Sequence, residues 1–176
     1  MKRFIFCTGL ACVMTFSGCS AQLMTAVPDL EKSFCAEAEI KTGGEALKGK
    51  LIRKAENCWE LQVAEPFALE GLTVTIENEE TTFSMFGYEA NTDFSEKAVS
   101  ALRLIAEAYE SAADNKGGFT DKKCEGTNEN GSYAVIVDDD GRVTGISAPE
   151  AAVQLSEWTE YTDSTTENEE DILIVE

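Results

Sequence analysis

Apolar and polar residues alternate along most of this chain, the pattern of strands that bury one face. The first alternating segment is 34–40, in which Phe34, Ala36, Ala38 and Ile40 are separated by polar or small residues. The same period recurs at 47–54, 58–63, 72–76, 81–86, 133–137, 142–147 and 153–158. The pattern therefore predicts a mainly antiparallel β-sheet.

Two turns fix the register of the first three strands. One turn is centred on Gly43-Gly44 and the other on Glu56, between apolar runs. Counting outward from each turn places the following residues opposite one another: Phe34, Arg53 and Trp59; Ala36, Leu51 and Leu61; Ile40 and Leu47. Directly opposed residues lie on the same side of a sheet, so the turns together predict a meander with one apolar face.

A single segment changes to the helical period. Residues 95–113 place Ala98, Leu102, Ile105 and Tyr109 on one stripe, with Ser95 as the expected N-cap. We expect this stripe to pack on the apolar sheet face. Residues 115–131 are polar and are predicted to form a long loop.

The N-terminus has the pattern of a bacterial lipoprotein signal. Lys2-Arg3 precede an apolar run, 4–16, that is too short to span a bilayer, and Ser17-Gly18-Cys19 follow. We expect residues 1–18 to be removed and Cys19 to carry lipid that anchors the protein to the extracytoplasmic face of the cell membrane. The alternative is an ordinary secretory signal cut nearby.

The segments that flank the domain are expected to have little regular structure. Residues 19–33 are predicted to be a tether with a short helix opened by Pro28 and reaching Lys32. The predicted domain is 34–160. Residues 161–176 are acidic and are predicted to be a disordered tail, with a docked strand at 172–175 as the alternative.

Composition excludes several classes of function. The chain has no histidine, so it lacks the base of Ser-His-Asp and Cys-His enzymes and the usual ligands of catalytic zinc. Its formal net charge of -19 disfavours nucleic acid as a partner. We expect no cofactor and no metal site, and only carboxylate-pair hydrolysis stays open among the catalytic classes.

The cysteines that remain after cleavage cannot all pair within one chain. Of the six, the expected signal and lipid site account for Cys7, Cys12 and Cys19, which leaves Cys35, Cys58 and Cys124. The register places Cys35 opposite Ile52 and Cys58 opposite Lys54. A third strand separates the two cysteines by about 9.6 Å, beyond the roughly 7 Å that a disulfide tolerates, so we predict no Cys35–Cys58 bond.

Two short motifs have simpler interpretations than binding. Asp138-Asp139-Asp140-Gly141 is similar to a calcium loop, but it lacks the bidentate glutamate and lies between strand patterns, which favours a hairpin turn. Asn130-Gly131-Ser132 fits a glycosylation sequence, but the Asn-Gly dipeptide is more typical of a turn.

Three segments resemble the LolA/LolB-like lipoprotein-carrier superfamily: 34–40 (FCAEAEI), 49–53 (GKLIR) and 66–74 (PFALEGLTV). The similarity is closer to lipoproteins of clostridial-type bacteria, including those associated with spore germination, and covers roughly 34–158. It implies an α+β fold, a strongly curved antiparallel half-barrel with a central helix on its concave face, able to hold an acyl chain or a peptide. It also implies a cargo-binding basic residue near the second and third strands, for which Arg53 is the nearest match.

The predicted ligand-binding residues are Phe34, Arg53, Trp59, Leu102 and Tyr109. Arg53 lies opposite aromatic residues on both sides, so we expect it to reach the rim of an apolar cavity beside the helix. The alternative is an Arg53 side chain that extends off the sheet edge or stacks on Trp59 without a ligand.

The expected function is that of a non-catalytic, membrane-anchored accessory lipoprotein that binds an envelope protein partner. One alternative is a carrier of a lipid, acyl chain or lipoprotein in its apolar half-barrel. The other is a carboxylate-based hydrolase, which requires two close acids in a cleft.

Overall fold

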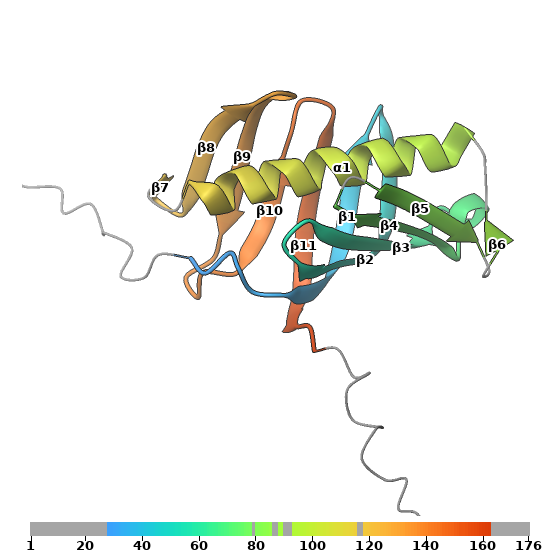
Figure 1. Ribbon diagram of the computed structural model, residues 1–176, viewed down its shortest axis with the longest axis horizontal. Helices are drawn as coiled ribbons and strands as arrows, with labels where there is room; N and C mark the ends of the chain where they lie inside the picture. Colours follow the sequence, from blue (N-terminus) through green and yellow to red (C-terminus); the bar gives the residue numbers. More distant parts are fainter. Residues whose placement is uncertain (1–27, 79, 86–87, 90–92, 116–117, 163–176) are drawn as a thin grey trace, which may run out of the picture.

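The protein is α+β, with one curved, open antiparallel sheet and one long helix (Figure 1). The computed structural model describes residues 28–162, with gaps at 79, 86–87, 90–92 and 116–117. The predicted signal, the lipid site Cys19 and all but the first two residues of the predicted tail therefore lie outside the described residues.

The strands of the described residues make a single sheet of eleven. The first six are β1 (Phe34–Thr42), β2 (Glu45–Ala55), β3 (Cys58–Glu65), β4 (Leu72–Glu77), β5 (Glu80–Met85) and β6 (Tyr88–Glu89). A short 3₁₀ turn, η1 (Phe67–Leu69), joins β3 to β4, and helix α1 (Asp93–Asp114) follows β6. The others are β7 (Phe119–Thr120), β8 (Lys123–Asn128), β9 (Gly131–Val137), β10 (Val143–Ser147) and β11 (Ala151–Glu160).

The chain builds the sheet as two meanders that meet in the middle. The strand order is β6-β5-β4-β3-β2-β1-β11-β10-β9-β8-β7, so the last strand pairs with the first. Phe34 lies opposite Glu160, and the Tyr161 amide donates a hydrogen bond of 3.2 Å to the Ser33 carbonyl. The start of β1 and the end of β11 thus lie side by side (Figure 1).

The predicted register of the first three strands is confirmed. Phe34, Arg53 and Trp59 lie opposite one another, as do the two other predicted sets. One detail is wrong, because a register shift between Arg53 and Ala55 places Cys58 opposite Ala55 instead of Lys54. The turn therefore has two residues, Glu56 and Asn57, between the paired positions, where the predicted pairing left three.

A second register shift interrupts the pairing of β2 with β3, and the extra residue is Ala64 of β3. The shift lies between Lys48 and Gly49, where the backbone of β3 comes very close. A Cβ atom on Gly49 would lie 1.9 Å from the Gln62 carbonyl oxygen, so only glycine fits there. Bulges of this kind increase local twist, which is consistent with the change of strand direction between β2 and β5 (Figure 1).

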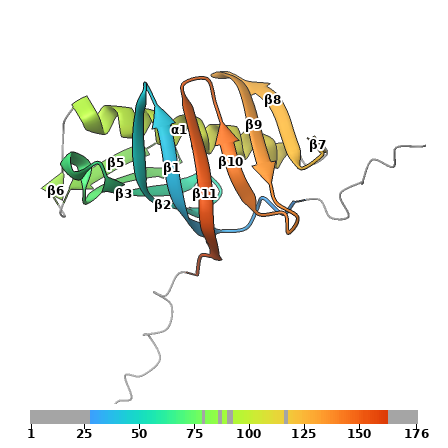
Figure 2. The ribbon, with the colours of Figure 1, turned by 180° about the vertical axis from the view of Figure 1, so that it is seen from behind.

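Helix α1 covers one face of the sheet, here named the inner face. Ala98, Leu102, Ile105 and Tyr109 are all buried, as the stripe predicted. Figure 2 shows the strands in front of the helix, and no element of the described residues packs over the other face. The helix begins at Asp93, so Ser95 lies in its first turn and is not the N-cap.

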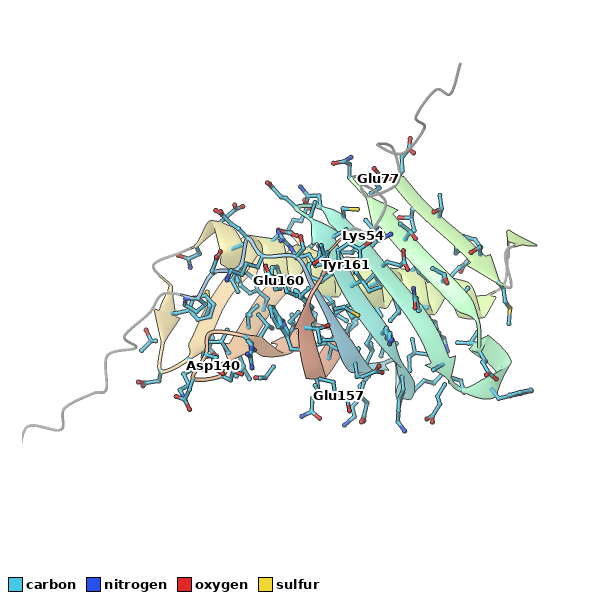
Figure 3. All side chains as sticks on the ribbon, turned by 90° about the horizontal axis from the view of Figure 1, so that it is seen from below. Lys54, Glu77, Asp140, Glu157, Glu160 and Tyr161 are labelled. Atoms are coloured by element: carbon cyan, nitrogen blue, oxygen red, sulfur yellow. The ribbon has the colours of Figure 1, made fainter. Side chains whose placement is uncertain are left out.

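The opposite, outer face is polar and open to solvent. Its side chains alternate with the core positions of β1 to β3 and form ion pairs across strands, including Lys54–Glu60 at 2.6 Å and Lys48–Glu65 at 2.8 Å. Figure 3 shows the side chains that project from the ribbon. One-sided burial explains why the period-two pattern is so clear in the sequence.

The prediction of a long loop at 115–131 is wrong, because β7 and β8 lie there. In β8 only Cys124 is buried, and its other side chains are half-buried or exposed. A strand this close to the edge of the sheet buries too little to show an apolar period. Its ladder to β9 stabilises it instead.

The short helix predicted at 28–32 is also wrong. The segment makes a turn in which the Glu31 amide bonds to the Asp29 carboxylate at 3.2 Å. The carbonyls of Leu30 and Glu31 accept hydrogen bonds from the distant side chains of Tyr109 and Arg53, which hold the segment in this turn. Leu30 is buried in the core, so this segment belongs to the fold.

Candidate functional site

Four of the five predicted site residues meet under the C-terminal half of α1. Phe34 contacts Trp59 and Tyr109 with ring centroids 5.8 and 5.9 Å apart, and Trp59 and Tyr109 are 5.0 Å apart. Trp158 stacks on Phe34 at 5.8 Å. These rings fill the space in which the sequence predicted a cavity.

Leu102 is the fifth predicted residue and lies elsewhere in the core. It is fully buried on the side of α1 that packs against the sheet. Seven helical residues separate it from Tyr109, a rise of about 10 Å along the helix axis. It packs the helix onto the sheet and does not extend the group formed by the other four.

Arg53 is buried, with only 2% of its surface exposed, and each nitrogen of its guanidinium has a hydrogen-bond partner within the protein. Its Nε and Nη2 donate to the two carboxylate oxygens of Glu110 at 3.1 and 2.9 Å. Its Nη1 donates to the Glu31 carbonyl at 2.8 Å. The prediction that Arg53 reaches a rim is wrong, because β2 is an interior strand and the helix supplies a carboxylate above it.

The guanidinium also packs on aromatic rings. Its central carbon lies 5.1 Å from the Tyr109 ring centre and 5.9 Å from that of Trp59. The alternative in which Arg53 contacts Trp59 is therefore the one the structure shows, although Arg53 is far from a sheet edge. Burial alone would lower the pKa of Arg53, but the hydrogen bonds and charge of Glu110 outweigh it and raise that pKa.

Glu110 is the residue that the sequence analysis missed. Besides its bond to Arg53, its Oε1 accepts hydrogen bonds from the Trp59 indole at 2.9 Å and from the backbone amide of Asn57 at 3.3 Å. A signal was available: an arginine on an apolar sheet face needs a buried partner, and Glu110 directly follows the core residue Tyr109. We name Phe34, Arg53, Trp59, Tyr109 and Glu110 the Arg53 cluster.

The Arg53 cluster fixes the segment at the N-terminal end of the described chain. The Tyr109 hydroxyl donates to the Leu30 carbonyl at 3.0 Å, and burial raises the pKa of that phenol, so it stays a donor. The Ser33 hydroxyl donates to the Lys54 carbonyl at 2.6 Å. Through these bonds and that of Arg53, residues 28–33 are held between the helix and β2.

The polar groups of the cluster bond to one another and to the backbone. Across the described part of the chain, every buried side-chain nitrogen and oxygen has a hydrogen-bond partner. A small cavity, of about 100 Å³, lies between residues 28–31, the end of α1 and Phe119. No member of the cluster lines it, and none lines the three larger hollows of about 530, 400 and 710 Å³.

The acidic motif at 138–141 is a hairpin turn, as predicted. The Asp138 carboxylate accepts the amides of Asp140 and Arg142 at 2.9 and 2.8 Å, and Lys122 pairs with Asp139 at 2.5 Å. Among the described residues, no group of three or more cysteine, aspartate or glutamate side chains is arranged to hold a metal ion.

The three cysteines of the described chain are free. Cys35 and Cys58 are half-buried on the outer face, and Cys124 is buried in the core. Burial, together with the charge of Glu77, raises the pKa of the Cys58 thiol, and burial alone raises that of Cys124. The thiols at 58 and 124 are thus weak nucleophiles at neutral pH.

We expect alkylation to distinguish these thiols. In the folded protein at pH 7.5, iodoacetamide should modify Cys35 and, slowly, Cys58, while Cys124 reacts only after unfolding in urea. Peptide mapping by mass spectrometry under non-reducing conditions measures all three. Recovery of a Cys35–Cys58 disulfide, or equal labelling of Cys124 in folded and unfolded protein, would contradict the register and the burial described here.

Comparison with known proteins adds no identification. No family model matches the chain, and no curated protein matches it. In the part of the chain that the structure describes, no helix combines the length and apolar character needed to cross a bilayer.

Proposed function

We propose that this protein is a non-catalytic accessory lipoprotein, anchored by lipid on Cys19 to the extracytoplasmic face of the membrane, where its folded domain binds an envelope protein. The N-terminal sequence supports the anchor, since a short apolar run ends in Ser17-Gly18-Cys19. The absence of histidine from the sequence supports a role without the common hydrolytic sites.

The filled interior is the observation that carries this proposal. A carrier needs an apolar cavity for its cargo, typically of several hundred Å³. Here the corresponding space holds the rings of Phe34, Trp59 and Tyr109, all nearly inaccessible to solvent. Recognition on the outside of the domain is therefore favoured over enclosure of an acyl chain.

We also propose that the fold is related to the half-barrel of LolA/LolB-like proteins. The support is architectural and comes from the described residues: antiparallel meanders, one long helix on one face, and β11 paired with β1. On this proposal the protein keeps the scaffold of a carrier, while the Arg53 cluster occupies the place of the cargo.

A fluorescence titration distinguishes the accessory protein from the carrier. Full-length protein with Trp158→Phe reports on Trp59 alone, and cis-parinaric acid serves as the acyl probe. We expect no saturable change in Trp59 emission, because the ring is buried and already packed. Unfolding in urea is the positive control for the reporter. A saturable change near one probe per protein would support the carrier and overturn the proposal.

A further inference from the structure

The turn between β3 and β4 exposes one large apolar side chain. Phe67 is 87% exposed, whereas Leu69, two residues later in the same turn, is buried in the core. The only other large apolar side chain that the described chain exposes is Ile136, at 46%. A phenylalanine so exposed gains nothing for the stability of the domain.

The turn that carries Phe67 is held in one shape by backbone hydrogen bonds. The amide of Leu69 donates to the Pro66 carbonyl at 2.8 Å, and that of Glu70 donates to the Phe67 carbonyl at 3.2 Å. The Gly71 amide closes the base of the turn on the Val63 carbonyl at 3.1 Å. Phe67 is thus presented on a preorganised turn, which reduces the entropy lost on binding.

Carboxylates flank this aromatic side chain on both sides. Glu65 and Glu70 are both exposed, and Lys48 pairs with Glu65 at 2.8 Å. Beside the turn, the hollow of about 530 Å³ is lined by 70–73, by residues of β2 and β3 that include Lys50, and by Glu37 of β1, so two carboxylates and one ammonium group face it. An apolar anchor with an acidic rim complements an apolar pocket with a basic rim.

The turn lies away from the end of the sheet that the expected tether joins, and its charge favours a protein over a lipid surface. The segment expected to lead to the lipid joins the sheet where Phe34, Arg53 and Trp59 lie opposite one another. The turn follows Glu65, six residues along β3 from Trp59, or about 20 Å away. Acids around Phe67 also repel anionic headgroups.

We infer that Phe67 is the anchor of a docking surface, inserted into an apolar pocket that lysine or arginine side chains surround on an envelope protein. This inference rests on the proposed accessory function and names the surface that performs it. Glu65 and Glu70 set the orientation and the rate of association, and Phe67 supplies most of the binding energy.

Site-specific photocrosslinking in the membrane tests this inference. Full-length protein carries benzoylphenylalanine in place of Phe67, with the same replacement of Ile136 as the matched control. Two further variants carry the probe at position 67 together with a charge reversal. One has Glu70→Lys, and its matched control has Glu77→Lys at the far end of β4 (Figure 3). Folding of each variant is checked by circular dichroism.

We expect one dominant protein adduct at position 67, at least about tenfold stronger than at 136, as for a central anchor against a peripheral contact. Glu70→Lys should reduce it about tenfold and Glu77→Lys should not. The crosslinked peptide should lie in a lysine- or arginine-rich region. Adducts only at 136 would overturn the Phe67 surface while leaving the proposed function standing. Adducts to lipid or to a second copy, or no effect of Glu70→Lys, would overturn the inference.

Discussion

Replacing Glu110 with glutamine is expected to lower the free energy of unfolding by about 3–5 kcal/mol, the cost of leaving one charge of a buried pair uncompensated. The carboxylate bonds to two guanidinium nitrogens of Arg53, to the Trp59 indole and to the Asn57 amide. An amide keeps the shape but not the charge, and its nitrogen faces donors. Urea unfolding followed by circular dichroism measures the difference.

Glu96→Gln is the matched control for this prediction. Glu96 lies in the same helix but is exposed, so its loss should change the stability by no more than about 0.5 kcal/mol. Equal effects of the two substitutions would show that Arg53 does not depend on Glu110. The double variant Arg53→Met/Glu110→Leu should recover part of the loss, since it removes both buried charges together.

Trp59→Ala is expected to destabilise the protein by about 3–5 kcal/mol, as large-to-small substitutions of buried aromatic residues do. The ring is fully buried between Phe34 and Tyr109 and donates its indole hydrogen to Glu110. Alanine therefore opens a cavity and removes a hydrogen bond from the cluster at the same time. Thermal and urea unfolding both report the loss.

Trp59→Phe separates these two effects. Phenylalanine keeps most of the aromatic packing but has no indole donor, so we expect a loss of only about 1–2 kcal/mol. If alanine costs as little as phenylalanine, the interior at Trp59 is not closely packed and a cavity becomes plausible again. The comparison therefore also bears on the carrier alternative.

The core of the sheet was predictable because it depends on local signals. The turns at Gly43-Gly44 and Glu56 fix which residues oppose each other, and alternation shows which face is buried. Both signals are strong in β1 to β3, where the outer face is polar. The same reasoning missed β8, since only Cys124 in that strand is buried.

The candidate site was predicted in part. The register brought Phe34, Arg53 and Trp59 together, and the helical stripe added Tyr109. The sequence did not show that Glu110 turns toward Arg53, a contact across 57 positions of the chain. Without that partner a buried arginine is costly, so the sequence argument placed Arg53 at a rim and left a cavity beside it.

The prediction of a helix at 28–32 was wrong for a related reason. Pro28 and the acids after it favour the first turn of a helix. The backbone carbonyls of Leu30 and Glu31 instead accept hydrogen bonds from Tyr109 and Arg53, which lie far along the chain. Tertiary contacts thus override the local preference, and no local pattern reports them.

Native mass spectrometry of the untagged protein, extracted from its own membrane, tests the central claim most directly. We predict a chain that begins at Cys19 with two or three covalent acyl groups, in a complex with one envelope protein and with no stoichiometric free lipid. Cys19→Ala should release the chain from the membrane. A chain that begins elsewhere would contradict the anchor. One non-covalent acyl lipid per chain, with no protein partner, would contradict the accessory function.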